Sequence, residues 1–139
     1  MKGQLRLSGG KKLNSPRGAK TRPTTSRVRE AVMNILSGEL DGCNWLDICS
    51  GTGIMGCEAL KRGAKKIIAI EINKKTSEIC NSNLRATADE VNHNNFIEVI
   101  NSDAVSWLKG GCLNQTRRFN EYSKDNDHLF DFIYLDPPY

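Results

Sequence analysis

Long apolar runs are absent from this sequence of 139 residues. A membrane-spanning helix needs about 20 consecutive apolar residues, and no stretch approaches that length. A secretory signal with an apolar middle is also absent. The basic, acid-poor start is loosely similar to an organelle transit peptide, but "LRLSGGKKL" favours a folded hairpin around Gly9-Gly10. These features predict a single cytoplasmic domain.

Paired cysteines are also missing. The five cysteines form an odd number, and no two of them are spaced as C-x-x-C. This pattern argues against a disulfide scaffold and against a structural zinc site. We therefore expect small buried thiols in a reducing cytoplasm, and no bound metal.

Acidic residues are scarce at the start of the chain. Residues 1–36 carry nine Lys or Arg and one acid, Glu30, for a charge of +8. The other residues carry 11 basic and 15 acidic side chains, for −4, and the two parts give the net +4. A basic arm on a mildly acidic body is typical of proteins that bind nucleic acid. A solvated terminus explains the charge equally well, so charge alone leaves both interpretations open.

Repeats and low-complexity tracts are absent, and patterns of helix and strand alternate instead. Strands are predicted over 44–49, 65–72, 95–100 and 129–135, and helices over 22–38, 54–63, 73–88 and 103–108. The first helix starts near Pro23 with Thr24 or Thr25, and Val28, Val32, Ile35 and Leu36 fall on one face. Residues 112–128 are polar and read as a long surface loop.

This alternation predicts an α/β fold of Rossmann-like type, with a parallel sheet and right-handed crossovers. We expect a basic arm or hairpin over 1–22 and the main domain over 23–139. Ligands of such sheets bind beyond the carboxyl ends of the strands. Four unusual groups fall at these ends: Asp47 to Gly53, Glu71, Ser102-Asp103, and Asp136 to Tyr139.

The first of these groups suggests a nucleotide-like cofactor. Gly51, Gly53 and Gly56 satisfy G-x-G-x-x-G between a strand and a helix, where glycine allows the backbone to approach a ligand. Glu71, 20 residues after Gly51, suits a carboxylate that accepts hydrogen bonds from ribose hydroxyls. The motif alone is weak evidence, because it is also that of dinucleotide-binding proteins.

Two acids discriminate between cofactors. Asp47 at the strand tip would repel a pyrophosphate and attract the ammonium of a methionine moiety, so it favours S-adenosylmethionine over NAD. Asp103 fits an acceptor for the adenine amino group. It is equally well explained as the N-cap of the helix that follows, and both roles can coexist.

The sequence "DFIYLDPPY" places an acid, two prolines and an aromatic ring directly after an apolar strand. An exocyclic amine on a nucleobase is a weak nucleophile, because its lone pair is delocalised into the ring. The carboxylate of Asp136 and a backbone carbonyl, expected to be that of Pro137, would accept its two N–H groups. The prolines restrict the backbone and hold these acceptors still. Tyr139 would stack on a flipped base.

Together these residues carry a family resemblance. "LDICSGTGIMGCEAL", "IEIN", "NSDA" and "DFIYLDPPY" resemble the motifs of class I S-adenosylmethionine-dependent methyltransferases that act on amino groups. With "LRLSGGKKL" and "TRPTTSRVREAVMNIL", nearly all of residues 5–139 resemble the bacterial 16S rRNA guanine 2-amino methyltransferase family.

The resemblance implies a methylated guanine in 16S rRNA of an assembling small ribosomal subunit. By position, it implies a cofactor pocket of Asp47, Gly51, Gly53, Glu71, Ile72 and Asp103. It places Asp136, Pro137 and Tyr139 on the target base, and Arg22, Thr24 and Arg27 near the cofactor entrance and the RNA.

Two departures from the family are evident. The 112–128 loop is longer than the family needs, and family members continue beyond the Asp-Pro-Pro-Tyr motif with strands that complete the sheet. We therefore expect an incomplete domain with weak cofactor binding and little or no turnover. The alternatives are a non-catalytic RNA-binding fragment, an amino methyltransferase acting on DNA or protein, and a nicotinamide-dependent oxidoreductase.

Overall fold

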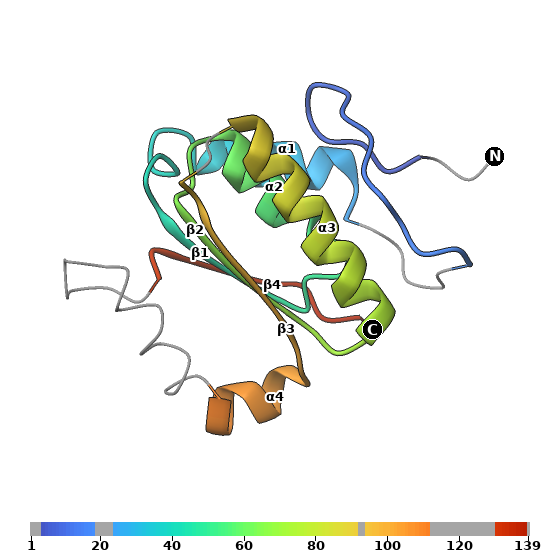
Figure 1. The fold of residues 1–139 in the computed structure, drawn as a ribbon. Coiled ribbons are helices and arrows are strands. Elements are labelled where there is room, and N and C mark those ends of the chain that lie inside the picture. The colour runs from blue at the N-terminus through green and yellow to red at the C-terminus, as the bar shows by residue number, and fades with distance from the viewer. Residues whose placement is uncertain (1–3, 19–23, 92–93, 112–129, 139) are drawn as a thin grey trace.

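The computed structural model of the chain describes residues 4–18, 24–91, 94–111 and 130–138 (Figure 1). Arg22, Tyr139 and the predicted loop at 112–128 lie outside the described residues, so the roles expected of them stay predictions. Within the described part of the chain, no helix combines the length and the apolar character required to cross a bilayer.

The core of the fold is a sheet of four parallel strands with the order β3-β2-β1-β4. The strands are β1 (Asn44–Ile48), β2 (Lys66–Glu71), β3 (Phe96–Asn101) and β4 (Phe132–Leu135). This topology confirms the predicted α/β class. All four strands run in the same direction, so their carboxyl ends share one edge of the sheet.

Helices cover the two faces of the sheet unequally (Figure 1). The helices α1 (Ser26–Ile35), α2 (Ile54–Lys61) and α3 (Lys74–Val91) pack on one face and form the larger core with Trp45, Ile67 and Ala69. On the other face lies the short α4 (Ala104–Ser106), which continues into a π-helical turn, Trp107–Gly111. Trp107 packs there against Leu46, Ile48, Ile68 and Ile70.

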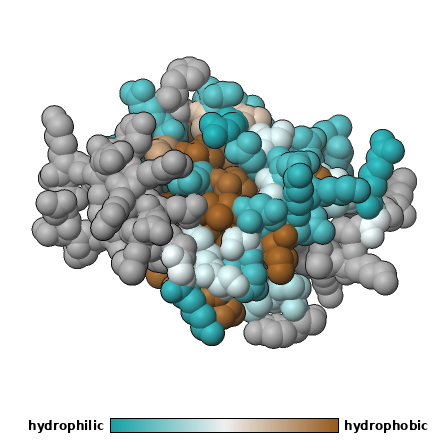
Figure 2. All heavy atoms as spheres, turned by 60° about the horizontal axis from the view of Figure 1, so that its bottom comes forward, coloured by the Kyte–Doolittle hydropathy of each residue, from teal (hydrophilic) through white to brown (hydrophobic). Residues whose placement is uncertain are grey.

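The second face leaves apolar surface exposed beside β4. Ile133 and Leu135 are 64% and 60% exposed. They pair in register with the buried Leu46 and Ile48 and therefore point to the same face. Figure 2 shows apolar side chains gathered between polar regions on the face that it brings forward.

The orientation predicted for α1 is wrong in part. Val28 and Ile35 are 47% and 79% exposed, whereas Arg29 and Met33 are buried. The helix is rotated so that Arg29 lies inward, because the buried carboxylate of Glu58 and two backbone carbonyls receive its guanidinium. A pattern of apolar residues could not reveal this, since it assumes that a charged residue faces solvent.

Helix starts follow the local capping chemistry. Thr25, one of the two predicted caps of α1, accepts a hydrogen bond from the Val28 N–H at 3.4 Å. Asn73 accepts one from the Thr76 N–H at 3.0 Å before α3, as its residue type predicts. Cys80 and Leu84 of α3 are buried, and the helix continues to Val91, beyond its predicted end at residue 88.

The arm, residues 4–18, belongs to the main core. A bridge between Arg6 and Lys12 is antiparallel, and the turn between them has Gly9 and Gly10 at φ 96° and 89°. Three leucines of the arm are buried against the helices: Leu5, Leu7 and Leu13. The arm is thus held by apolar contacts as well as by its charges.

Candidate functional site at the carboxyl edge of the sheet

Four carboxylates gather around one thiol at the carboxyl edge. The pKa of Cys49 is raised chiefly by burial, and further by the negative charges of Glu71, Asp47, Asp103 and Asp136. These acids follow or end four different strands, and parallel packing brings them to one place. The edge therefore carries strong negative potential, which suits a cationic or amine-bearing ligand.

The turn between β1 and α2 has a backbone that few residue types adopt. Cys49 has φ 62°, which is unusual for a residue other than glycine, and such strain clusters at functional sites. Gly51 has φ 55°, and a Cβ built on it would meet nothing within 4 Å. The absence of a side chain at Gly51 allows the positive φ and leaves open space beside the turn.

The other two glycines of the motif serve packing. Gly53 has φ 76°, and a Cβ there would lie 2.7 Å from the Cys80 Sγ. A Cβ on Gly56 would lie 2.9 Å from Leu84 Cδ2. Both glycines allow α2 to lie close to α3, so the G-x-G-x-x-G spacing reflects helix packing as much as ligand approach.

Glu71 ties the turn to the end of β2. Its Oε2 accepts the Gly51 N–H at 2.9 Å, and its Oε1 accepts the Asn73 N–H at 2.9 Å. Each carboxylate oxygen can accept more than one hydrogen bond, so both remain able to receive hydroxyl donors. Ile72, next in the chain, is 67% exposed and presents an apolar side chain beside this carboxylate.

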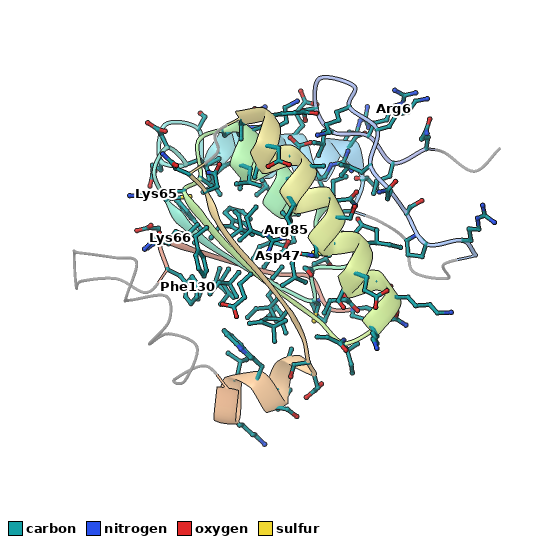
Figure 3. The ribbon with its side chains drawn as sticks, viewed as in Figure 1. Arg6, Asp47, Lys65, Lys66, Arg85 and Phe130 are labelled. Atoms are coloured by element: carbon teal, nitrogen blue, oxygen red, sulfur yellow. The ribbon has the colours of Figure 1, made fainter. Side chains whose placement is uncertain are left out.

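Asp47 lies deeper than the sequence indicates. It is the residue before the last of β1, it is 2% exposed, and it lies between the sheet and the helix layer (Figure 3). Burial raises its pKa to about 7, the Gly56 N–H opposes this rise, and Asp136 and Glu71 add to it. Within the described residues its Oδ2 has no hydrogen-bond partner. A buried, unpaired oxygen under the glycine turn can receive a donor or a cation from above.

Asp103 is the N-cap of α4. Its Oδ1 accepts the Ser106 N–H at 2.8 Å and the Ser106 hydroxyl at 2.9 Å. These hydrogen bonds lower the pKa of Asp103 and keep it ionised. The capping role that the sequence left open is present, and the carboxylate stays exposed at the edge.

Asp136 sits just beyond the tip of β4 and is exposed. Its Oδ2 accepts the Thr24 hydroxyl at 3.0 Å and lies 3.5 Å from the Tyr134 hydroxyl. Pro137 follows it and is half-buried. Arg27, in the first turn of α1, is exposed and therefore accessible to a large partner. The structure thus brings Thr24 to Asp136, a pairing that the sequence did not predict.

Sequence reasoning missed three polar residues that join the arm to the site: Arg29, Glu58 and Asn83. Asn83 is buried, and its Nδ2 donates to the carbonyls of Asn14 and Thr52, each at 3.0 Å. Its Oδ1 accepts the Asn14 N–H at 2.9 Å. Because Thr52 lies in the glycine turn, this side chain links the arm to that turn. Its position three residues after the buried Cys80, on the same side of α3, was the available signal.

The sequence matches a known protein family over almost its whole length. The family model described as "Conserved hypothetical protein 95" matches residues 3–139. The chain belongs to this family. The chain is 33% identical over 136 residues to "Putative rRNA methyltransferase YlbH" of Bacillus subtilis, covering 96% of the chain and 65% of the relative. It is 33% identical over 141 residues to "Ribosomal RNA small subunit methyltransferase D" of Escherichia coli, covering 99% and 61%.

Solved structures place the fold among class I methyltransferases. "Putative methyltransferase yhhF" from Escherichia coli aligns with a TM-score of 0.63 at 38% identity, over 76% of this chain and 57% of that one. A methylase of Haemophilus influenzae, HI0767, aligns with a TM-score of 0.60 at 28% identity, over 99% and 66%. The chain spans 58–65% of the length of four of its curated relatives.

Proposed function

We propose that the chain forms the cofactor-binding part of an enzyme that methylates the 2-amino group of a guanine in 16S rRNA. The observation that carries this proposal is the position of Asp136. Its exposed carboxylate stands at the same edge as the glycine turn and Glu71, so an amine acceptor adjoins the residues expected to bind the cofactor. The relatives named as rRNA methyltransferases support the same proposal.

S-adenosylmethionine fits the residues at this edge better than a dinucleotide does. Its sulfonium and ammonium are positive, and an acid ends or follows each of the four strands at this edge, whereas a pyrophosphate would be repelled by those acids that are ionised. Glu71 would accept the ribose hydroxyls and Ile72 would contact the adenine. Asp103 would accept the adenine amino group, and the backbone of Gly51 and Gly53 would border the methionine part. Asp47 would act from below the turn on the ammonium.

The main contribution of the protein to the reaction would be to position the target amine. S-adenosylmethionine supplies a methyl group on a positively charged sulfur. Asp136 would accept one N–H of the guanine 2-amino group, and the Pro137 carbonyl the other, so that the nitrogen lone pair is directed at the methyl carbon. As the methyl group is transferred from sulfur to nitrogen, Asp136 would also ease loss of the amine proton. Tyr139 would stack on the base.

The RNA would be met by the basic arm and the start of α1. Exposed basic residues there are Arg6, Lys12, Arg17 and Arg27, and Arg22 and Thr24 lie in the same segment of the chain. Figure 3 shows Arg6 on the arm, directed away from the sheet. Contacts of this kind to phosphates supply affinity that falls with salt. We propose 16S rRNA within an assembling small subunit, in the cytoplasm, as the partner.

Methyl transfer from labelled S-adenosylmethionine tests the proposal. The chain, extended by the C-terminal strands expected of its family, is incubated separately with intact small subunits, free 16S rRNA, DNA and a protein mixture, and the modified base is identified after digestion. We expect label on the guanine 2-amino group of rRNA. Label only in DNA or protein would assign another amino substrate, and salt-sensitive RNA binding without any transfer would favour a non-catalytic RNA-binding role. Calorimetry with S-adenosylmethionine and NAD decides the cofactor.

A further inference from the structure

Thr24 is the one described residue outside β4 that the structure hydrogen-bonds to Asp136. Its hydroxyl donates to Asp136 Oδ2 at 3.0 Å, although 112 positions separate the two residues. A carboxylate at an exposed strand end rotates freely unless a donor fixes it. With Oδ2 held by Thr24, Oδ1 is the oxygen that remains for a target amine.

Thr24 is itself held by a buried side chain. Arg29 is 6% exposed, and its Nη1 donates to the Thr24 carbonyl at 2.6 Å. Its Nη2 donates to the carbonyl of Arg6 in the arm at 2.8 Å. The planar guanidinium thus joins the start of α1 to the arm in a fixed geometry that a lysine could not reproduce.

Glu58 of α2 forms a long ion pair with this guanidinium, whose Nε has no hydrogen-bond partner within the described residues. Its side chain is fully buried, and its Oε1 lies 3.9 Å from Arg29 Nε. The same oxygen accepts the Ser8 N–H at 2.7 Å and the Ser8 hydroxyl at 3.0 Å, and Oε2 pairs with Arg62 at 2.7 Å. A buried carboxylate this well partnered is costly to displace, so Glu58 offers Arg29 a fixed negative charge.

We propose that Thr24 is a positioning residue that fixes the carboxylate of Asp136, and that Arg29, anchored by Glu58, fixes Thr24. This inference rests on the proposed function of Asp136 and changes the role expected of Thr24, which the sequence had placed with Arg22 and Arg27 on the RNA. The arm and the first turn of α1 would then serve the reacting group directly as well as the RNA.

Kinetics of Thr24→Val and Thr24→Ser separate the two roles. Valine matches the shape of threonine but has no hydroxyl, and serine restores the donor. We expect Thr24→Val to lower kcat about tenfold or more, with KM for RNA and Kd for S-adenosylmethionine within about twofold of wild type. We expect Thr24→Ser to retain most of kcat. Arg29→Lys should lower kcat in the same way, because one ammonium cannot hold both carbonyls.

Thr25→Val is the matched control. It removes the helix cap of α1 next door but not the contact to Asp136. A loss of kcat in Thr25→Val equal to that in Thr24→Val would show a general loosening of α1 and overturn the proposal. An increase in KM for RNA in Thr24→Val, with kcat unchanged, would overturn it too and return Thr24 to the RNA surface.

A double-mutant cycle on unfolding tests the contact without any activity. The equilibrium constants for unfolding of wild type, Thr24→Val, Asp136→Ala and the double variant are measured in urea. We expect the two changes to be non-additive by about fivefold, as for an ordinary exposed hydrogen bond. If the wild-type protein transfers no methyl group, only the proposed function is contradicted. If the effects of the two substitutions on unfolding are strictly additive, the role of Thr24 is contradicted.

Discussion

The tips of β1 and β2 differ from the tip of β4 in how they are held. The turn after β1 is tied to β2 by Glu71 and to α3 and the arm by Asn83, and most side chains around it are buried. Asp136 after β4 is exposed, and the contacts that the structure gives its side chain come from Thr24 and Tyr134. β4 is also the edge strand of the described sheet.

The difference indicates that the two halves of the site are built on separate supports. The half that would bind the cofactor depends on the buried interface of β1, β2, α2 and α3, which are close in sequence. The half that would receive the base depends on contact between segments far apart in the chain. We expect substitutions to divide accordingly: those in the cofactor half should change stability and cofactor affinity, and those near β4 should change turnover.

Asp136→Asn should have the largest effect. Asparagine keeps the size of the side chain but loses the charge and one acceptor, so we expect turnover to fall about a thousandfold. The Kd for S-adenosylmethionine should change by less than about twofold, because the residue does not support the glycine turn. Methylation kinetics and calorimetry measure the two quantities, with Asp89→Asn on the exposed side of α3 as the control. Substantial turnover in Asp136→Asn would remove the residue from the chemistry.

The buried Asp47 should make stability depend on pH. Its pKa is about 7 in the folded chain, above the 3.8 of an unperturbed aspartate. Between these values the folded state keeps a proton that the unfolded state has lost. The free energy of unfolding therefore falls as pH rises from 4 to 7, by up to about 4 kcal/mol, and is level above that range.

Denaturation of wild type and Asp47→Asn across this pH range measures the effect. The asparagine cannot ionise, so the difference between the two proteins isolates the contribution of Asp47 from that of all other groups. Parallel stability curves would show that Asp47 ionises in the folded chain as readily as in the unfolded one.

Gly53→Ala and Gly51→Ala should differ in stability. Both glycines have positive φ, but a Cβ on Gly53 also collides with the Cys80 Sγ, whereas one on Gly51 meets open space. We expect Gly53→Ala to cost about 3 kcal/mol of unfolding free energy, and Gly51→Ala about 1 kcal/mol, from strain alone. Urea denaturation compares them. Equal costs would mean that α3 moves away from the turn to accept the methyl group.

Of these substitutions, Glu71→Ala should change the stability of the fold least, but it should directly weaken cofactor binding. The variant loses the acceptor for Gly51 and the expected acceptor for the ribose hydroxyls, so the Kd for S-adenosylmethionine should rise about tenfold. Glu78→Ala, on the exposed side of α3, is the control for calorimetry. An unchanged Kd in Glu71→Ala would place the ribose elsewhere.

The sequence alone was sufficient for the order of elements and for the edge where the acids meet. Strand and helix periods indicated the parallel sheet, and carboxyl ends that share an edge brought Asp47, Glu71, Asp103 and Asp136 together. The caps Thr25 and Asn73 followed from residue type, because capping is a contact between neighbours in the chain. β4 begins at Phe132 rather than at residue 129 as predicted, and just before it the carboxylate of Asp131 accepts the Asn44 N–H.

What only the tertiary structure decided is how charge is buried and how distant segments meet. Apolar periodicity predicted the wrong buried face for α1, because it carries no information about the buried Glu58 that pairs with Arg29. The sequence pattern predicted Asp47 at the surface of the strand tip, although the residue is buried under the glycine turn. The pattern also did not predict that Thr24 contacts Asp136. Patterns along a chain report contacts between near neighbours and the average preference of each residue type for solvent. The buried Arg29 and Glu58 are 29 positions apart, and Thr24 and the exposed Asp136 are 112 positions apart, so each pair meets only once the chain has folded.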